Sequence, residues 1–376
     1  MARGKFGEAV LNKLLNIFLG KPFPVLKKAP ETGKWYALPI GSAKSSDGTA
    51  WEGYFKKGSV NKLVVCFFGG GVSIDNYSAA RTHEAPGGFY NPRITQGQIV
   101  MANCEKSMGL TGKSKKNPFR DWSVIMVPYC NGDFHAGAGE THYKGLDQKT
   151  HTMYYHGFLN YRAILEEGMK YLPGETVELF ITGGSAGGFG AAILADDIME
   201  HFPRVQKAAV CVDSALLCYK DWRAVMETQW HSPGHICEPI HSENITLDAL
   251  TSAKQKYGKR LTVLFDCSIR DAALAQTQVY FDRSVLPQEA SRADGDRFQK
   301  LLKAMTEALR RQVPDCGIYI WEKEVTGDAQ LTPHTITGVN LVFKPMDQGP
   351  SLADWIKDAL AGNVRSYGLG LLDKQY

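Results

Sequence analysis

The segment Val177–Gly190 reads VELFITGGSAGGFG and does the most to predict the fold of the whole chain. An apolar, β-branched run leads into Gly183-x-Ser185-x-Gly187, and small residues then continue as a predicted helix. A serine at the tip of a sharp strand-to-helix turn needs glycines two positions before and after it, so that strand and helix can approach closely. The pattern predicts a nucleophile elbow at Ser185. A glycine-rich packing or phosphate-binding turn is the alternative, but no Gly-Lys-Ser/Thr follows, which excludes a Walker loop.

Strand-like and helix-like runs alternate along the rest of the chain. Near-continuous apolar strands separated by helices favour a parallel sheet covered on both faces. We therefore expect an α/β-hydrolase-like fold with a mostly parallel central sheet, helices on both faces and inserted cap loops. The predicted strands are 62–68, 122–127, 177–182, 208–212, 261–265, 318–321 and 339–343, and the predicted helices are 154–171, 190–201, 272–280 and 296–312.

The chain is expected to form one domain over residues 31–376, preceded by an amphipathic helix and lead-in at 1–30. A Gly, Pro and His-rich stretch predicts an insertion near 218–258 that shapes the substrate site. The N-terminal helix is expected to pack on the domain or a partner subunit, with docking on a membrane surface as the alternative. The sequence leaves the oligomeric state open.

Composition excludes several classes of protein. The 376 residues are 44% hydrophobic and 22% charged, which excludes disorder and low-complexity scaffolding. A net charge of +4 without a basic stripe predicts no nucleic-acid partner. The sequence contains no apolar run of 18 residues, so no membrane span is predicted. Because the N-terminus lacks a signal-peptide pattern and the eight cysteines form no CxxC pair, we expect reduced thiols and a cytoplasmic location.

A second glycine cluster follows an early predicted strand at Gly69–Gly71. In α/β-hydrolases a loop at this place donates one backbone N–H to the oxyanion hole, and the residue after the serine donates the other. The predicted donors are Gly70 or Gly71 together with Ala186.

A serine nucleophile needs a histidine base and an acid that orients it, in the chain order Ser, Asp/Glu, His. His334 is the last histidine and lies in a predicted loop, so it is the expected base. Two aspartates follow or end the preceding strand, Asp266 and Asp271. We favour Asp271, because it follows the strand in a loop, and keep Asp266 as the alternative acid.

Further polar residues are candidates for the cleft. Asp133 and His135 follow a predicted strand and are expected to line the cleft, with a structural role for Asp133 as the alternative. His235 lies in the predicted insertion and is a further substrate-binding candidate. Nearby His231, Cys237 and His241 could suggest a metal site, but Pro233 and Pro239 interrupt any helix that would present the ligands together. We expect neither a metal nor a cofactor.

Together, four motifs resemble the pectinacetylesterase/Notum family of serine esterases, in what would be a bacterial branch. They are GGSAGG at 183–188, FRDW at 119–122 with VPYCxGD at 127–133, the glycine triplet at 69–71, and Asp213-Ser214. The resemblance runs from about Leu63 to His334 and implies an α/β-hydrolase fold. It also implies removal of O-linked acyl groups, either acetyl from plant pectin or palmitoleoyl from a secreted signalling protein.

The expected function is that of a serine esterase that uses Ser185, His334 and Asp271 and passes through an acyl-enzyme. By resemblance, its substrate is an O-acetyl ester on a carbohydrate. The alternatives are a lipase or carboxylesterase for longer acyl chains, and a non-catalytic carbohydrate- or lipid-binding protein on the same fold.

Overall fold

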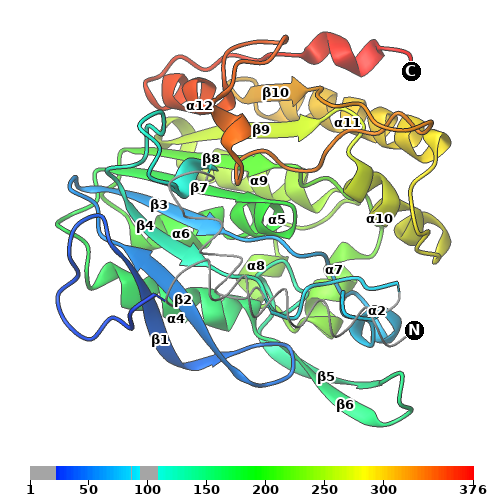
Figure 1. The fold of residues 1–376 in the computed structure, drawn as a ribbon, viewed down its shortest axis with the longest axis horizontal. Helices are drawn as coiled ribbons and strands as arrows, with labels where there is room; N and C mark the ends of the chain where they lie inside the picture. The colour runs from blue at the N-terminus through cyan, green and yellow to red at the C-terminus, as the bar shows by residue number, and fades with distance from the viewer. Residues whose placement is uncertain (1–22, 86, 94–108) are drawn as a thin grey trace, which may run out of the picture.

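An eight-stranded sheet forms the centre of the computed structural model, which describes residues 23–85, 87–93 and 109–376 (Figure 1). The predicted N-terminal helix lies outside these residues. The strand order is β1-β2-β4-β3-β7-β8-β9-β10. The strands are β1 Trp35–Lys44, β2 Ala50–Lys56, β3 Lys62–Phe67, β4 Ser123–Val127, β7 Glu178–Gly184, β8 Lys207–Asp213, β9 Leu261–Ser268 and β10 Gly317–Trp321.

The six strands from β4 to β10 in this order run parallel, and only β1 and β2 are antiparallel to their neighbours. All five residues of β4 are buried, as are those of β8 after its first lysine. Strands covered on both faces are apolar almost throughout, which is why the sequence pattern identified them. The mostly parallel α/β-hydrolase-like sheet with helices on both faces is confirmed.

Helices connect the strands and pack on the sheet. Helix α4 packs against β1 and β4, α5 against β7 and β8, α9 against α5 and β9, and α12 against β8 and β9. The longer helices are α4 Gly157–Met169, α5 Ala186–Ile193, α6 Ala195–His201, α9 Ile245–Tyr257, α10 Ala272–Arg283, α11 Arg292–Gln312 and α12 Leu352–Leu360.

Several predicted elements differ from the structure, and the predicted helix 190–201 is divided at Leu194 between the end of α5 and α6. The predicted helix 154–171 begins only at Gly157, because Tyr154 and Tyr155 end β6 (Thr150–Tyr155). Strand β6 pairs with β5 (Gly139–Lys144) in a hairpin that extends from the body of the fold (Figure 1). The predicted strand 339–343 is instead a 3₁₀ turn, η4 Asn340–Phe343, that contacts the short turn η1 Gly109–Thr111. Short apolar runs do not distinguish these structures.

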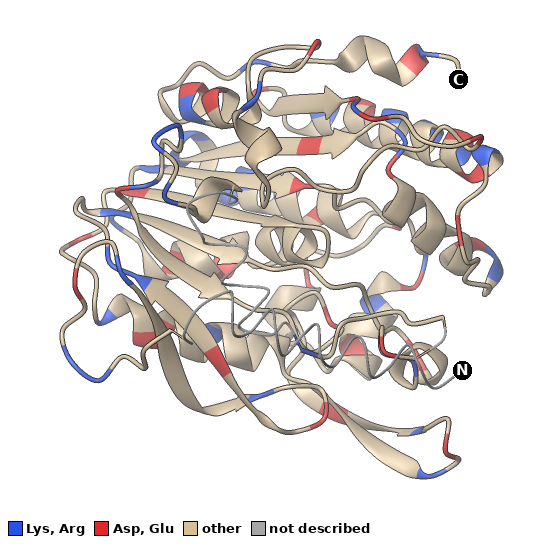
Figure 2. Ribbon diagram, viewed as in Figure 1, with Lys and Arg blue, Asp and Glu red and all other residues tan. Residues whose placement is uncertain are grey.

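Segment 218–244 of the expected insertion holds only short elements between β8 and α9. They are α7 Trp222–Ala224, the π-helical turn η2 Val225–Gln229 and α8 Gly234–Cys237. The remainder of the insertion is α9, which connects β8 to β9 and packs in the core. Lys and Arg positions are interspersed with Asp and Glu positions along the described ribbon, in agreement with a net charge of only +4 (Figure 2).

Candidate active site

Ser185 is the single residue between the end of β7 and the start of α5. Its backbone has φ 58° and ψ −130°, a conformation that non-glycine residues seldom adopt. The N–H of Ser185 donates to the carbonyl of Asp213 at 2.9 Å, and its own carbonyl accepts from the N–H of Gly188 at 2.8 Å. The turn predicted from the glycine pattern is therefore present, with a strained serine at its tip.

The glycines on either side of the serine are required by close backbone contacts. A Cβ at Gly183 would lie 2.3 Å from the carbonyl oxygen of Gly187. A Cβ at Gly187 would in turn lie 2.2 Å from the carbonyl oxygen of Phe67 at the end of β3. Neither contact can be relieved by moving a flexible side chain, so the spacing of two residues before and after Ser185 has a direct steric cause.

Ser185 and His334 line the same cavity, which has a volume of about 590 Å³. The glycine triplet forms part of the same wall. Most of the other lining side chains are apolar, among them Val72, Phe89, Leu110, Phe134, Phe189, Leu217, Leu274 and Leu286. The cavity thus combines a small polar cluster with a large apolar surface, as binding sites for small organic groups do.

Asp271 and His334 are hydrogen-bonded in this cluster. Oδ2 of Asp271 lies 2.7 Å from Nδ1 of His334, while Oδ1 accepts from the N–H groups of Ala273 and Leu274 as the N-cap of α10. The loop that carries His334 is tied to the same place, because Thr332 exchanges backbone hydrogen bonds with the residues on either side of Asp271. A hydrogen bond from Nδ1 to the carboxylate leaves Nε2 as the ring nitrogen available for proton transfer.

The pKa of His334 is raised above its ordinary value. Burial alone lowers this pKa, but attraction and hydrogen bonding from the carboxylate of Asp271, with a contribution from Asp213, outweigh the loss of solvent. The imidazole side chain is 23% exposed, so it remains accessible from the cavity. This arrangement stabilises the imidazolium that a general base becomes after it accepts a proton.

Asp266, the alternative acid, lies inside β9 and is fully buried. Its Oδ2 accepts a weak hydrogen bond from Sγ of Cys211 at 3.6 Å. Burial, together with the neighbouring carboxylate of Asp213, raises the pKa of Asp266 well above its usual range. Of the two aspartates, Asp271 is the one whose carboxylate is hydrogen-bonded to His334.

The glycine triplet approaches the elbow through its first member. A Cβ at Gly69 would lie 2.7 Å from Cβ of Ser185 and 3.1 Å from the backbone nitrogen of Ala186. The predicted donor Gly70 also lines the cavity. The other predicted donor, Gly71, has φ 81° and lies against the backbone of Phe89. Gly69 belongs to the predicted triplet but was not among its predicted donors, although it is the member nearest the end of β3.

Asp133 and His135 lie behind the glycine loop, and neither lines the cavity. His135 donates from Nε2 to the carbonyl of Phe68 at 2.8 Å, and Asp133 accepts from the N–H groups of His135 and Gly157. Burial lowers the pKa of His135 to about 4 and raises the pKa of Asp133 to about 7. The expected contact of Asp133 and His135 with substrate is therefore not found. Both side chains are hydrogen-bonded to backbone groups and support the glycine loop.

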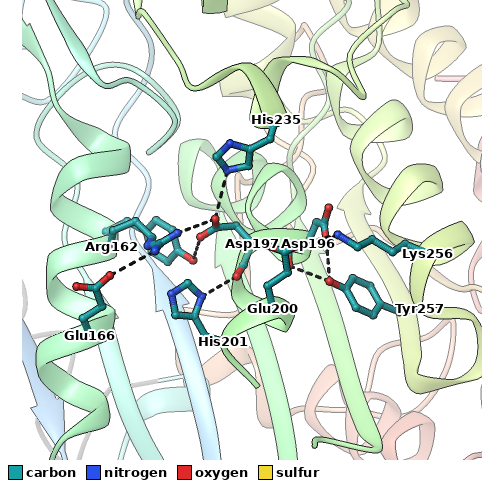
Figure 3. Close-up of polar contacts among 10 residues, drawn as sticks. Arg162, Glu166, Asp196, Asp197, Glu200, His201, His235, Lys256 and Tyr257 are labelled. Carbon is teal, nitrogen blue, oxygen red and sulfur yellow. Dashed lines mark hydrogen bonds and ion pairs between the residues drawn. The ribbon is translucent and has the colours of Figure 1, made fainter. Parts of the chain in front are cut away.

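His235 likewise lies away from the cavity of Ser185, so the structure does not support its predicted role in substrate binding. Its Nε2 contacts Oδ1 of Asp197 on α6 (Figure 3), at a distance of 3.4 Å. The same buried carboxylate accepts from the hydroxyl of Tyr161 at 2.7 Å and from Arg162 at 3.0 Å. His235 therefore belongs to a polar network that joins α4, α6 and the loop segment 218–244.

The strand order and the serine elbow define an α/β-hydrolase. Comparison with known proteins identifies the family: the model of the pectinacetylesterase family, described as "PAE: Pectinacetylesterase", matches residues 39–246, more than half of the chain. The protein belongs to this family.

The similar proteins agree with this assignment. Pectin acetylesterase 11 of Arabidopsis thaliana is 28% identical over 173 residues, which are 45% of this chain and 41% of the relative. Pectin acetylesterase 4 of the same plant is 25% identical over 182 residues, 46% and 39% of the two chains. The chain thus spans about two fifths of the curated relatives it matches. The solved structure of the Wnt deacylase Notum from Drosophila superposes with a TM-score of 0.56 at 16% identity, over 88% of this chain and 94% of Notum, and supports the fold.

The expected cytoplasmic location is wrong. The pectin acetylesterases related to this chain are secreted or extracellular proteins, which points away from the cytoplasm. The expectation rested on the pattern of the first residues, which lie outside the part that the structure describes. No helix among the described residues is long and apolar enough to cross a membrane.

Proposed function

We propose that the protein is a serine esterase that hydrolyses O-acyl esters with Ser185 as nucleophile, His334 as general base and Asp271 as the acid that orients the base. The observation that carries this proposal is the 2.7 Å contact between Asp271 and His334, in a cavity that His334 shares with the strained elbow of Ser185. Nucleophile, base and orienting acid are the three parts that acyl transfer requires.

In the proposed reaction, Oγ of Ser185 bonds to the ester carbonyl carbon while its proton passes to Nε2 of His334. The tetrahedral intermediate then breaks the bond to the alcohol, which leaves with the proton from His334. Water attacks the acyl carbon in the same way and gives a proton to His334, which passes it to Oγ of Ser185 as the bond to the acyl group breaks and the carboxylic acid leaves. The imidazolium formed in each half-reaction faces the carboxylate of Asp271, which stabilises it.

The negative oxygen of the intermediate is proposed to accept hydrogen bonds from the N–H of Ala186 and from the glycine loop. Ala186 is the first residue of α5, so its N–H has no partner within the helix. The second donor is proposed to be the N–H of Gly70 or Gly71. Gly69 is a further candidate, because it lies close to Ser185. One such donor contributes about 3 kcal/mol to stabilisation of the transition state.

For the substrate, the names of the relatives favour acetyl groups on a carbohydrate such as pectin. A second candidate is an ester of a longer acyl chain, because an apolar cavity of about 590 Å³ is far larger than an acetyl group. Burial of each added methylene in such a cavity favours binding by about 0.8 kcal/mol.

The test measures hydrolysis of p-nitrophenyl acetate, octanoate and palmitate, together with acetate release from acetylated pectin. We expect Ser185→Ala and His334→Ala to abolish turnover, and a fluorophosphonate to label the wild type but not Ser185→Ala. Ser59→Ala, a serine in an exposed loop, is the matched control. A wild type that neither turns over any ester nor takes up the label would contradict the esterase and favour a non-catalytic binding protein. A kcat/KM that rises from acetate to octanoate would favour the longer acyl chain.

A further inference from the structure

The carboxylate of Asp213, at the end of β8, holds the loop that carries His334. Its Oδ2 accepts three hydrogen bonds: from the N–H of Ile336 at 2.8 Å, the N–H of Thr337 at 2.8 Å and the hydroxyl of Thr337 at 2.6 Å. The backbone carbonyl of the same residue accepts from the N–H of Ser185 at 2.9 Å. One residue thus contacts both the elbow and the loop of the proposed base.

The loop needs this attachment because its backbone is strained. Thr335, directly after His334, is β-branched and yet has φ 59°. Such a conformation persists only where the surroundings enforce it. The enforcing contacts are the hydrogen bonds that the N–H groups of the next two residues donate to Asp213, and the packing of Thr335 against the elbow, where a Cβ at Gly184 would lie 3.1 Å from Cγ2 of Thr335.

Asp213 has a second carboxyl group beside it. Asp266 is its register partner on the adjacent strand β9, and both side chains are fully buried. Within the described residues, Oδ1 of each group is buried and has no hydrogen-bond partner. A hydrogen bond between the two carboxyl groups would satisfy both and needs one proton between them, since two buried carboxylates in contact cannot both be ionised.

The surroundings decide which group carries that proton. Asp213 receives three donors on Oδ2, which stabilise its ionised form. Asp266 receives a weak thiol bond at 3.6 Å, and the effect of this bond and of the nearby Trp321 indole is outweighed by burial and by Asp213. The titratable groups that face Asp266 are Asp213 and Cys211 on β8, Cys267 on its own strand and Tyr319 on β10, and none of them carries a positive charge.

We propose that Asp213 is a positioning residue that fixes His334 relative to Ser185, and that Asp266 is the neutral acid whose O–H holds Asp213 in place. This inference rests on the proposed function for its effect on rate. It also gives Asp266 a part in the site that differs from that of an ionised orienting acid.

The test compares Asp266→Asn, Asp266→Leu and Asp213→Ala with the wild type, and Asp347→Asn, an exposed carboxylate, serves as the matched control. Asparagine keeps an N–H that can donate to Asp213, whereas leucine has similar size and no donor. We expect kcat of Asp266→Asn on p-nitrophenyl acetate to stay within about threefold of wild type. We expect Asp266→Leu and Asp213→Ala to lose about 100-fold in kcat with little change in KM, as misplacement of a reacting group does.

The proton on Nδ1 of His334, observed by proton NMR, gives a readout that needs no turnover. We expect its resonance to be kept in Asp266→Asn and shifted or broadened in Asp266→Leu. A loss of kcat in Asp266→Asn as large as that in Asp271→Asn would overturn the proposal, because Asp266 would then be needed as an ionised carboxylate. The proposal would also be overturned if Asp266→Leu kept the kcat of the wild type, or if kcat and KM changed in parallel. A wild type without esterase activity refutes the proposed function alone, since the NMR comparison still tests the placement of His334.

Discussion

Asp271 serves two elements with its two carboxylate oxygens: Oδ2 faces Nδ1 of His334 at 2.7 Å, and Oδ1 caps α10. The cap fixes the carboxyl group at the N-terminus of a helix, so the orientation of His334 depends on a rigid element rather than on a free loop. Capping and catalysis can be separated because an amide can still accept the two cap hydrogen bonds.

Asp271→Asn is therefore expected to lower kcat by about 10⁴-fold while leaving stability close to wild type. The amide oxygen can cap α10, but an amide N–H facing Nδ1 forces the imidazole into the wrong tautomer. Initial rates on p-nitrophenyl acetate and a thermal melt of each protein measure the two effects. A variant that loses less than tenfold in kcat would show that Asp271 is not the orienting acid.

The pH dependence of kcat/KM is expected to show an acid limb with a midpoint above about 6.5, the ordinary value for histidine. The sign follows from the raised pKa of His334: a base must be unprotonated, so activity is lost as pH falls through this pKa. Rate profiles between pH 5 and 9, about two units on either side, locate the limb. In Asp271→Asn the residual activity should titrate at lower pH, and an unchanged midpoint would contradict the assignment.

Gly187→Ala is expected to destabilise the protein by more than about 2 kcal/mol and to remove activity. The added methyl group would lie 2.2 Å from the carbonyl oxygen of Phe67, so β3 and the elbow would have to separate. Denaturant unfolding measures the loss. Gly370→Ala is the control, because a Cβ there has no neighbour within 4 Å. Equal stability of the two variants would show that the elbow is not closely packed.

His135→Gln is expected to change how stability depends on pH. The pKa of His135 is lowered to about 4 by burial, so its contribution is complete above its unfolded pKa and is lost as pH falls through 4. Glutamine can still donate to the carbonyl of Phe68 but does not titrate. The advantage of wild type over the variant should therefore shrink by about 3 kcal/mol from neutral pH to pH 4.

Denaturant unfolding of wild type and His135→Gln at several pH values tests this expectation. The difference between the two proteins is the quantity to follow, because the raised pKa of Asp133 acts in the opposite direction on both. A pH-independent difference would contradict a buried neutral histidine.

The sequence predicted the parallel strands and the elbow well, because both depend on local pattern: apolar runs for β4 and β8, and a steric need for glycine around Ser185. The pairing of Asp271 with His334 was an expectation from chain order, since contacts 63 residues apart leave no local mark. Whether His135 and His235 line the cavity could not be predicted from a local pattern. A histidine in a loop has the same sequence signal whether it faces a cavity or a carbonyl group.

The residues that line the cavity come from two kinds of segment, strand ends of the central sheet and segments outside the sheet. Ser185 follows β7 directly and Asp213 ends β8, whereas Phe89, Leu110 and Leu286 of the apolar lining lie in segments outside the sheet. Exchanging side chains on those outer segments would retune acyl-length selectivity without disturbing the reacting atoms. Substrate preference could therefore be changed separately from the proposed reacting groups.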